Sequence, residues 1–191
     1  MTSALIFDYF GVVRRDGGLR GAYRALGGDP DVADKRFVDD TIAAANYGLV
    51  DSGEVFAQKL GVTLAEWRRA AGASDRNDPE LLAWVEQLRP RYKTALLSNA
   101  GQGALQTFFT PAELRRYFDV AISSGDIGFA KPVPEIFHYA AEKLGVPPGA
   151  CVMIDDQPLN CEGAELAGMQ AVQFITFAQV QHDVAQLLGS A

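Results

Sequence analysis

Short apolar runs recur along the chain, and each is followed by polar or glycine-rich residues and then by a helical pattern. The runs cover residues 3–8, 93–99, 119–124, 151–156 and 170–175. Strands that are apolar on both faces and alternate with helices are typical of a parallel sheet covered by helices on both sides. The sequence therefore predicts an α/β fold built on a doubly wound parallel sheet.

Residues 15–77 interrupt this alternation, because they contain no convincing strand. Their apolar residues recur instead with helical spacing, in short segments separated by glycines. The segments are 19–28, 31–48, 52–61 and 63–72. We expect a small all-helical cap domain at 15–77, inserted after the first strand, and an α/β core domain formed by 1–14 and 78–191. The Arg-Arg-Asp stretch at 14–16 is expected to be a solvated flap between them.

Local signals mark where several core helices begin. Asp78 stands before a proline, and Thr110 stands before Pro111 with Glu113 three residues after it. These are the residue types that cap helix N-termini. The segment 134–145 opens with proline and ends on glycine, which predicts a complete helix.

The ends of the predicted strands carry the reactive side chains. Asp8 ends the first strand, Ser98 the second, and Asp155 and Asp156 the fourth, while Lys131 precedes a proline and a helix after the third. In open α/β sheets, ligands bind beyond the carboxyl ends of the strands. We therefore expect these side chains to meet at one edge of the sheet.

Three carboxylates at one edge would repel one another unless a cation lay among them. A few hard oxygen ligands, with room left for water and phosphate, suit Mg²⁺. Lys131 and the Ser98 hydroxyl can then hold the oxygens of an anion, helped by backbone N–H groups near helix starts. An ionised Asp8 beside a metal and a bound phosphate is suited to attack phosphorus and to form an aspartyl-phosphate.

Four segments in order resemble the motifs of the haloacid dehalogenase-like (HAD) superfamily, whose members are mostly Mg²⁺-dependent phosphohydrolases. IFDYFGVV resembles the first motif, LLSNA the second, GFAKPVPEIF the third and VMIDDQPLNCEGAELAGM the fourth. The likeness covers nearly the whole chain, and the helical insert resembles the cap of subfamily I, which acts on small soluble substrates. It implies a Rossmann-like core, Mg²⁺ as cofactor and a small phosphorylated metabolite as substrate.

The resemblance also implies which residues hold the metal. Asp8 would be both the nucleophile and a metal ligand. Phe10 would supply a ligand through its backbone carbonyl, which does not depend on the side chain. Asp156 would ligate Mg²⁺ directly, and Asp155 through water.

A second set of residues would form the phosphate-binding group, namely Ser98, Asn99 and Lys131. Within this group, Ser98 and Lys131 would contact phosphate, and Lys131 would also offset negative charge. Asn99, like Asn160, would orient the loops.

Position 10 departs from the family pattern, which has an aspartate there as the general acid/base. Its loss removes a proton donor for the leaving group, and general acid–base catalysis typically contributes about 10²–10⁴-fold. The penalty is smallest for leaving groups that are stable as anions, as in acyl or aryl phosphates. One branch of the family with a first motif of the FDxGxV kind also lacks this aspartate, and some of its members behave as phosphatases.

Two function hypotheses follow. The first is a Mg²⁺-dependent phosphohydrolase that acts on a small phosphorylated metabolite with weakened general acid/base catalysis. The alternative is a catalytically impaired HAD-fold protein that serves as a binding or regulatory module. Dehalogenation is disfavoured because haloacid dehalogenases lack the acidic pair that Asp155 and Asp156 form here.

Composition excludes several other function classes. The net charge of −7 disfavours a broad basic face for nucleic acid, and the longest apolar runs are too short to span a membrane. Cys151 and Cys161 form neither a disulfide framework nor a zinc-binding CxxC pair. The first residues lack the basic leader of a signal peptide. We expect a cytoplasmic monomer or homodimer that binds a small metabolite.

Overall fold

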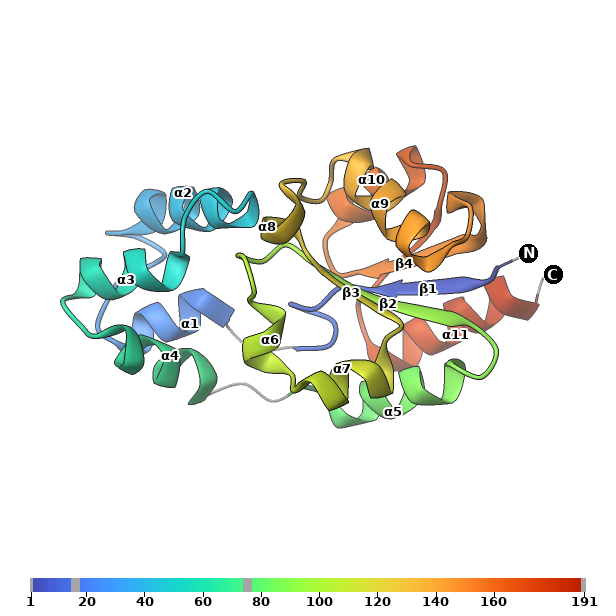
Figure 1. The fold of residues 1–191 in the computed structure, drawn as a ribbon, viewed down its shortest axis with the longest axis horizontal. Coiled ribbons are helices and arrows are strands. Elements are labelled where there is room, and N and C mark those ends of the chain that lie inside the picture. Colours follow the sequence, from blue (N-terminus) through green and yellow to red (C-terminus); the bar gives the residue numbers. More distant parts are fainter. Residues whose placement is uncertain (1, 15–17, 74–76, 190–191) are drawn as a thin grey trace.

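The structure is a computed structural model of the 191-residue chain, and it describes residues 2–14, 18–73 and 77–189. The colours of Figure 1 follow the elements along the chain. The elements are β1 (Ala4–Phe7), α1 (Gly18–Ala25), α2 (Lys35–Asn46), α3 (Ser52–Leu60), α4 (Leu64–Ala73), α5 (Pro79–Leu88), β2 (Lys93–Ser98), α6 (Leu105–Phe108), α7 (Pro111–Tyr117), β3 (Val120–Ser123), α8 (Ser124–Ile127), α9 (Pro134–Leu144), the 3₁₀ turn η1 (Pro148–Ala150), β4 (Cys151–Asp155), α10 (Pro158–Leu166), β5 (Gln170–Gln173) and α11 (Phe177–Gly189).

The strands form one parallel sheet in the order β3-β2-β1-β4-β5, which confirms the predicted fold class. In the centre of the sheet, Phe7 pairs with Leu96 on one side and with Ile154 on the other. The chain runs outward from β1 to β3 and then returns to the opposite side of β1 with β4. This reversal lies between β1 and β4, and such a reversal is where ligands bind in open α/β sheets.

Alternate residues of each strand supply the two hydrophobic layers. Leu5 and Phe7 face a layer that α5, α7 and α11 cover, whereas Ala4 and Ile6 face a layer that α9 and α10 cover. Figure 1 shows these two groups of helices on opposite sides of the sheet. The central strand is fully buried, because both of its faces pack against helices.

The predicted helix starts are confirmed in the core. The Asp78 side chain accepts from the backbone N–H groups of Glu80 and Leu81, and Thr110 and Glu113 form a reciprocal capping box. The helix expected over 31–48 begins later, at Lys35. The reason is local, since the Asp29 carboxylate accepts from the backbone N–H groups of residues 31–33 and holds them in a turn.

Helices α1 to α4 make up a helical lobe, which we define as residues 18–73, and no strand occurs among these residues. The lobe has a hydrophobic core of its own, in which Tyr23, Phe56 and Trp67 pack together. In Figure 1 the lobe stands beside the sheet, away from the two termini. Within the described part of the chain, every helix is too short or too polar to cross a membrane.

Candidate active site

Three carboxylates gather at the carboxyl end of the sheet. Asp8 directly follows β1, Asp155 ends β4, and Asp156 is the next residue. Oxygen atoms of these three residues all lie within 4.8 Å of one another. The parallel register of β1 and β4 brings them together, because it ends both strands at the same edge.

Lys131 lies between two of these carboxylates. Its Nζ donates to Asp8 Oδ1 and to Asp155 Oδ2, at 2.6 Å in both cases. All three side chains are nearly inaccessible to solvent, with 1% exposure for Lys131 and 7% for Asp8. An ion pair with so little solvent is far less screened than a surface pair.

Burial governs the ionisation of these groups. It raises the pKa of Asp8 to about 7, although the Lys131 ammonium acts to lower that pKa and the Asp155 charge acts to raise it further. Burial also opposes the charge of Lys131, but the two carboxylates outweigh it and raise the pKa of the ammonium. The carboxylates thus stabilise the Lys131 ammonium, and burial makes Asp8 a weaker acid than an exposed aspartate.

Both oxygens of Asp155 are already engaged. Oδ2 accepts from Lys131, and Oδ1 accepts from the Gln157 backbone N–H and from Asn160 Nδ2, both at 2.9 Å. Asn160 lies in α10, where its side chain is buried. These hydrogen bonds fix the position of the Asp155 side chain, which in turn holds the Lys131 ammonium.

Asp156 has one oxygen that is free to take a ligand. Its Oδ2 accepts from Gln157 Nε2 at 2.6 Å, whereas Oδ1 is buried and has no hydrogen-bond partner. Gly11 lies directly against this carboxylate, since a Cβ at position 11 would be 2.4 Å from Asp156 Cγ. The backbone at Gly11 has φ of +92°, a conformation that favours glycine.

Of the other two predicted phosphate-binding residues, one contacts Lys131 and the other precedes it in the chain at the end of β2. The Asn99 side chain accepts from the Lys131 N–H and donates to the Lys131 carbonyl, at 2.8 Å in both cases. Ser98 ends β2 beside β1, and its hydroxyl is buried without a partner. Asn99 thus holds the lysine backbone, while Ser98 offers a free hydroxyl; their contact with phosphate stays a prediction.

Phe10 packs into an aromatic cluster. Its ring centroid lies 4.8 Å from that of Tyr9 and 5.9 Å from that of Phe108. The Arg14 guanidinium lies over the Phe108 ring at 4.5 Å and over the Phe10 ring at 5.7 Å. The phenyl ring at position 10 is therefore held by its neighbours, and it carries no group that could exchange a proton.

The expectation of a solvated flap at 14–16 is wrong for Arg14, which is only 2% exposed. Its guanidinium donates to the Ala71 carbonyl of α4 at 2.9 Å, and so it joins the residue that follows the first motif to the helical lobe. Residues 15 and 16 lie outside the described residues. Sequence reasoning missed this contact because Arg14 stands in a turn without any periodic pattern.

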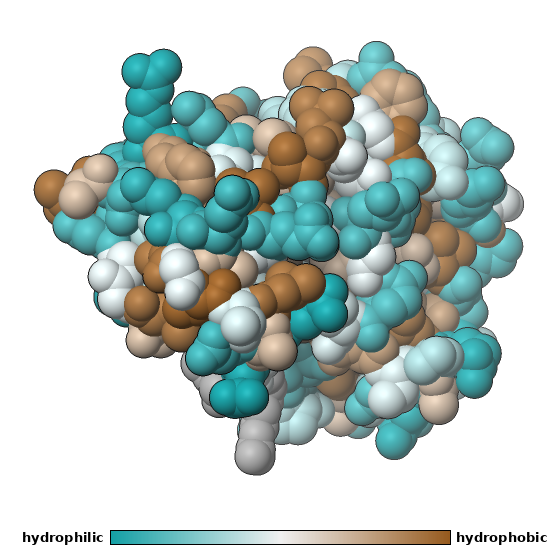
Figure 2. Space-filling model, turned by 60° about the vertical axis from the view of Figure 1, so that its left-hand side comes forward, coloured by the Kyte–Doolittle hydropathy of each residue, from teal (hydrophilic) through white to brown (hydrophobic). Residues whose placement is uncertain are grey.

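A cleft of about 1280 Å³ opens beside Asp156. One wall belongs to the helical lobe, and the other comprises Phe10, Gly11, Asp156, Gln157 and the loop after β2. Figure 2, in which the lobe comes forward, shows hydrophobic side chains in clusters among hydrophilic ones. Asn99 and Asp156 both line this cleft, whereas Asp8, Ser98, Lys131 and Asp155 are buried and are not part of its lining.

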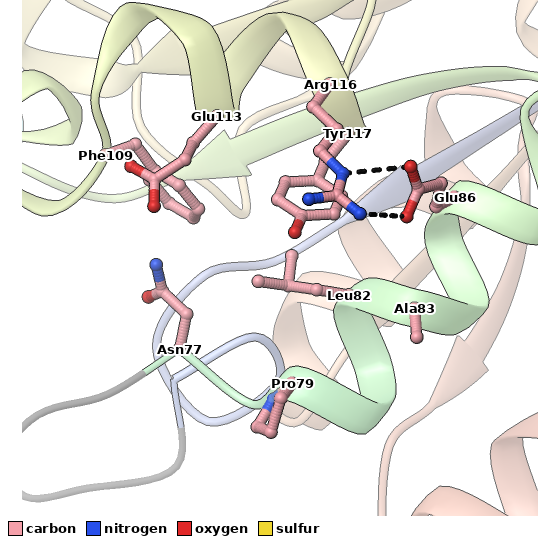
Figure 3. A pocket seen from close by; sticks show the side chains of 9 residues that line it. All are labelled: Asn77, Pro79, Leu82, Ala83, Glu86, Phe109, Glu113, Arg116 and Tyr117. Atoms are coloured by element: carbon pink, nitrogen blue, oxygen red, sulfur yellow. Dashed lines mark hydrogen bonds and ion pairs between the residues drawn. The ribbon is translucent and has the colours of Figure 1, made fainter.

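A smaller hollow of about 420 Å³ lies between α5 and α7. Figure 3 shows the Arg116 guanidinium facing the Glu86 carboxylate across it. The guanidinium donates two hydrogen bonds, one to each carboxylate oxygen, and both are 2.9 Å long. Glu113 is engaged in capping α7, and Asn77 accepts from the Tyr9 hydroxyl. Since its charged groups already pair or cap a helix, this hollow lacks the chemistry of the larger cleft.

The chain is similar in sequence to known proteins over most of its length. A family model described as haloacid dehalogenase-like hydrolase matches residues 3–168. Human N-acylneuraminate-9-phosphatase is 31% identical over 97 residues, which are 50% of this chain and 39% of the relative. Phosphoserine phosphatase of Thermus thermophilus is 34% identical over 96 residues, which are 49% of this chain and 39% of the relative. The chain thus aligns with well under half the length of these curated relatives.

Solved structures share the fold over nearly the whole chain. A HAD family enzyme from Bacteroides thetaiotaomicron, in complex with magnesium and inorganic phosphate, superposes with a TM-score of 0.76 at 21% identity, covering 94% of this chain and 99% of that one. A HAD-like family hydrolase from Porphyromonas gingivalis gives a TM-score of 0.78 at 23% identity, with 98% of each chain covered.

Proposed function

Because the chain belongs to the haloacid dehalogenase-like hydrolase family, we propose that it is a Mg²⁺-dependent phosphohydrolase that acts on a small phosphorylated metabolite through an aspartyl-phosphate. The observation that carries this proposal is the buried set of Asp8, Lys131 and Asp155, together with a third carboxylate, Asp156, which lines the cleft. Support comes from relatives that are named as phosphatases of small metabolites.

The carboxylates fit a hard divalent cation. Their oxygens converge within 4.8 Å, and the buried Oδ1 of Asp156 has no protein donor. We assign Asp8, Asp156 and the Phe10 backbone carbonyl as ligands, and Asp155 as a partner through water, because both of its oxygens already accept hydrogen bonds. Bound Mg²⁺ would supply positive charge to the phosphoryl oxygens and keep Asp8 ionised.

The chemistry then depends on this chain's own side chains. The Asp8 carboxylate attacks phosphorus, the P–O bond to the alcohol breaks, and the alcohol oxygen leaves with the electron pair. Lys131 and the Ser98 hydroxyl hold the phosphoryl oxygens, while Asn99 keeps the Lys131 backbone in place. Water then attacks the aspartyl-phosphate and restores Asp8 as phosphate departs.

Phe10 sets which leaving groups depart readily. In this proposal it replaces the aspartate that otherwise gives the leaving oxygen its proton, so that the proton must come from solvent. Hydrolysis of aryl and acyl phosphates should therefore be faster than that of alkyl phosphates. We further propose that residues 15–77 form a subfamily I cap domain over a core of 1–14 and 78–191, since the helical lobe has its own core and walls the cleft.

The test of the nucleophile uses Asp8→Asn. The wild type should release phosphate from 4-nitrophenyl phosphate and acetyl phosphate in Mg²⁺ but not in EDTA, and Asp8→Asn should abolish that release. Asp40→Asn, an exposed change on α2, is the matched control and should leave turnover unchanged. Full activity in Asp8→Asn would overturn the assignment.

The test of the proton relay uses Phe10→Asp and Phe10→Leu. A carboxylate at position 10 should raise turnover of alkyl phosphates by about 10²-fold or more if proton transfer limits the rate. Phe10→Leu alters the aromatic packing without adding an acid, and so it should bring no such gain. Equal behaviour of the two folded variants would show that another step is limiting.

A binding or regulatory role is the second candidate, and the packing of Phe10 among Tyr9, Phe108 and Arg14 is what favours it. Such a protein would bind Mg²⁺ and beryllofluoride, detected by calorimetry, without hydrolysing any member of a broad phosphate-ester panel. Turnover of any ester that Asp8→Asn abolishes would decide for the enzyme.

A further inference from the structure

The helical lobe presents one face of α4 to the cleft. Leu64, Trp67, Arg68, Ala71 and Gly72 all line it, with the spacing of a single helical face. Trp67 is buried in the lobe core, and its ring centroid lies 5.0 Å from that of Phe56. The orientation of α4 is therefore fixed by packing, and the face that it turns to the cleft is well defined.

Helix α4 is also held by a residue outside the lobe. The Ala71 carbonyl accepts a hydrogen bond from Arg14, which directly follows the first motif. Ala71 is one turn after Arg68 on the same face, so the Arg68 position is tied to the segment that carries the nucleophile. A Cβ at Gly72 would meet no atom within 4 Å, which leaves open space beside Arg68.

Arg68 differs from the other charged residues of the lobe that line the cleft. Arg20 is engaged elsewhere, by the Pro30 carbonyl and by Asp39, and the Asp51 carboxylate caps α3. Arg68 is exposed, and among the described residues it has neither an ion pair nor a hydrogen bond. Its guanidinium is therefore available to a molecule that occupies the cleft.

We propose that Arg68 binds a second oxyanion of the substrate, so that the enzyme prefers phosphate esters that carry another anionic group, such as a carboxylate, at their far end. This inference rests on the proposed phosphohydrolase function. A guanidinium presents paired N–H donors that match both oxygens of a carboxylate or a phosphate. In this arrangement the phosphate to be cleaved would lie at the core wall of the cleft, where Asp156 and Asn99 line it, and Arg68 would contact the other end of the molecule from the lobe wall.

The experiment compares aryl phosphates in matched pairs. The two members of a pair differ only in the para substituent, which is a carboxylate in one and the uncharged carboxamide in the other. The pairs differ in the linker that carries this substituent, which has zero to three methylene groups, because the span of the cleft decides which length reaches Arg68. An aryl bisphosphate series distinguishes a second phosphate from a carboxylate. The measured quantity is the ratio of kcat/KM for the charged ester to that for its neutral partner.

In the wild type, at least one linker length should give a preference for the charged ester, and Arg68→Ala should reduce that preference by about three- to tenfold, as expected for one charge-assisted contact near solvent. The loss should appear mainly in KM, and kcat/KM for the carboxamides should not change. Arg69→Ala is the matched control, since Arg69 is the next exposed arginine of α4 and lies outside the cleft lining.

The inference is overturned if the ratio in Arg68→Ala equals that of the wild type for every linker and for the bisphosphates. In that case, hydrolysis of the esters would still support the proposed function. If no ester is hydrolysed, the proposed function fails. The role of Arg68 in binding the second oxyanion is then tested separately, by calorimetric binding of the corresponding phosphonates to the wild type and to Arg68→Ala. Equal affinities in that measurement would also overturn it.

Discussion

Gly11→Ala tests the geometry of the site through a single methyl group. Gly11 has φ of +92°, and an added Cβ would lie 2.4 Å from Asp156 Cγ and 2.5 Å from its Oδ2. Carbon atoms in contact are normally separated by about 3.5–4.0 Å. The Asp156 carboxylate would therefore have to move by about 1 Å, or the turn at Gly11 would have to open.

Two separate effects follow from this substitution. The positive φ alone costs an alanine about 1–2 kcal/mol, whatever surrounds it. The displacement of Asp156 acts on the proposed metal site, where a misplacement of about 1 Å can cost about 10²-fold in rate. We therefore expect Gly11→Ala to lower Mg²⁺ affinity and turnover of 4-nitrophenyl phosphate, in addition to its loss of stability.

Gly27→Ala separates the two effects. Gly27 has φ of +93°, almost the same as Gly11, but an added Cβ would meet no atom within 4 Å. This control should lose the same 1–2 kcal/mol from backbone strain, by urea denaturation, and keep wild-type Mg²⁺ affinity by calorimetry. If Gly11→Ala keeps Mg²⁺ affinity and turnover at the level of Gly27→Ala, the contact with Asp156 does not control the site and the reasoning fails.

Two further predictions concern buried titratable groups. Lys131→Met leaves Asp8 and Asp155 buried without their ammonium, and should reduce the free energy of unfolding in EDTA by about 3–5 kcal/mol. Mg²⁺ should restore part of this loss. A urea denaturation curve of the variant in EDTA that matches the wild-type curve would contradict this prediction. Burial raises the pKa of both Cys151 and Cys161 to about 11. Because an unfolded thiol has a pKa of about 8.5, iodoacetamide at pH 8 should label the native protein about 10²-fold more slowly than the urea-unfolded chain, and the stability that the neutral thiols contribute should decline as the pH rises from about 8.5 towards 11. Equal labelling rates would refute the burial argument.

The sheet could be predicted from sequence because its signals are local. Each strand is a short apolar run, and the parallel order forces the strand ends to one edge. The approach of Asp8 to Asp155 follows from that rule without any knowledge of tertiary contacts. The helices that begin at Pro79 and Pro111 were equally predictable, since their capping residues lie within four positions of the helix start.

The remaining features depend on contacts between distant segments. Gly11 is required because Asp156, from another strand end, lies against it, and no local pattern contains that information. Arg14 is buried because Phe108 and Ala71 cover it from two other parts of the chain. Helical periodicity shows which residues share a face with Arg68, but the element that this face meets is decided only by the docking of the lobe.

The charges of the carboxylate cluster are consistent with the divalent cation proposed above. Three carboxylates and one ammonium leave two negative charges when all are ionised, which is the charge that one divalent cation balances. A cation there would also lie beside Asp156 Oδ1, whose burial without a partner otherwise costs about 1–3 kcal/mol. It would lower the pKa of Asp8, which burial raises to about 7, and so keep the nucleophile ionised. Charge balance, the unpaired oxygen and the raised pKa are distinct consequences of the same folding, and a divalent cation would account for each of them.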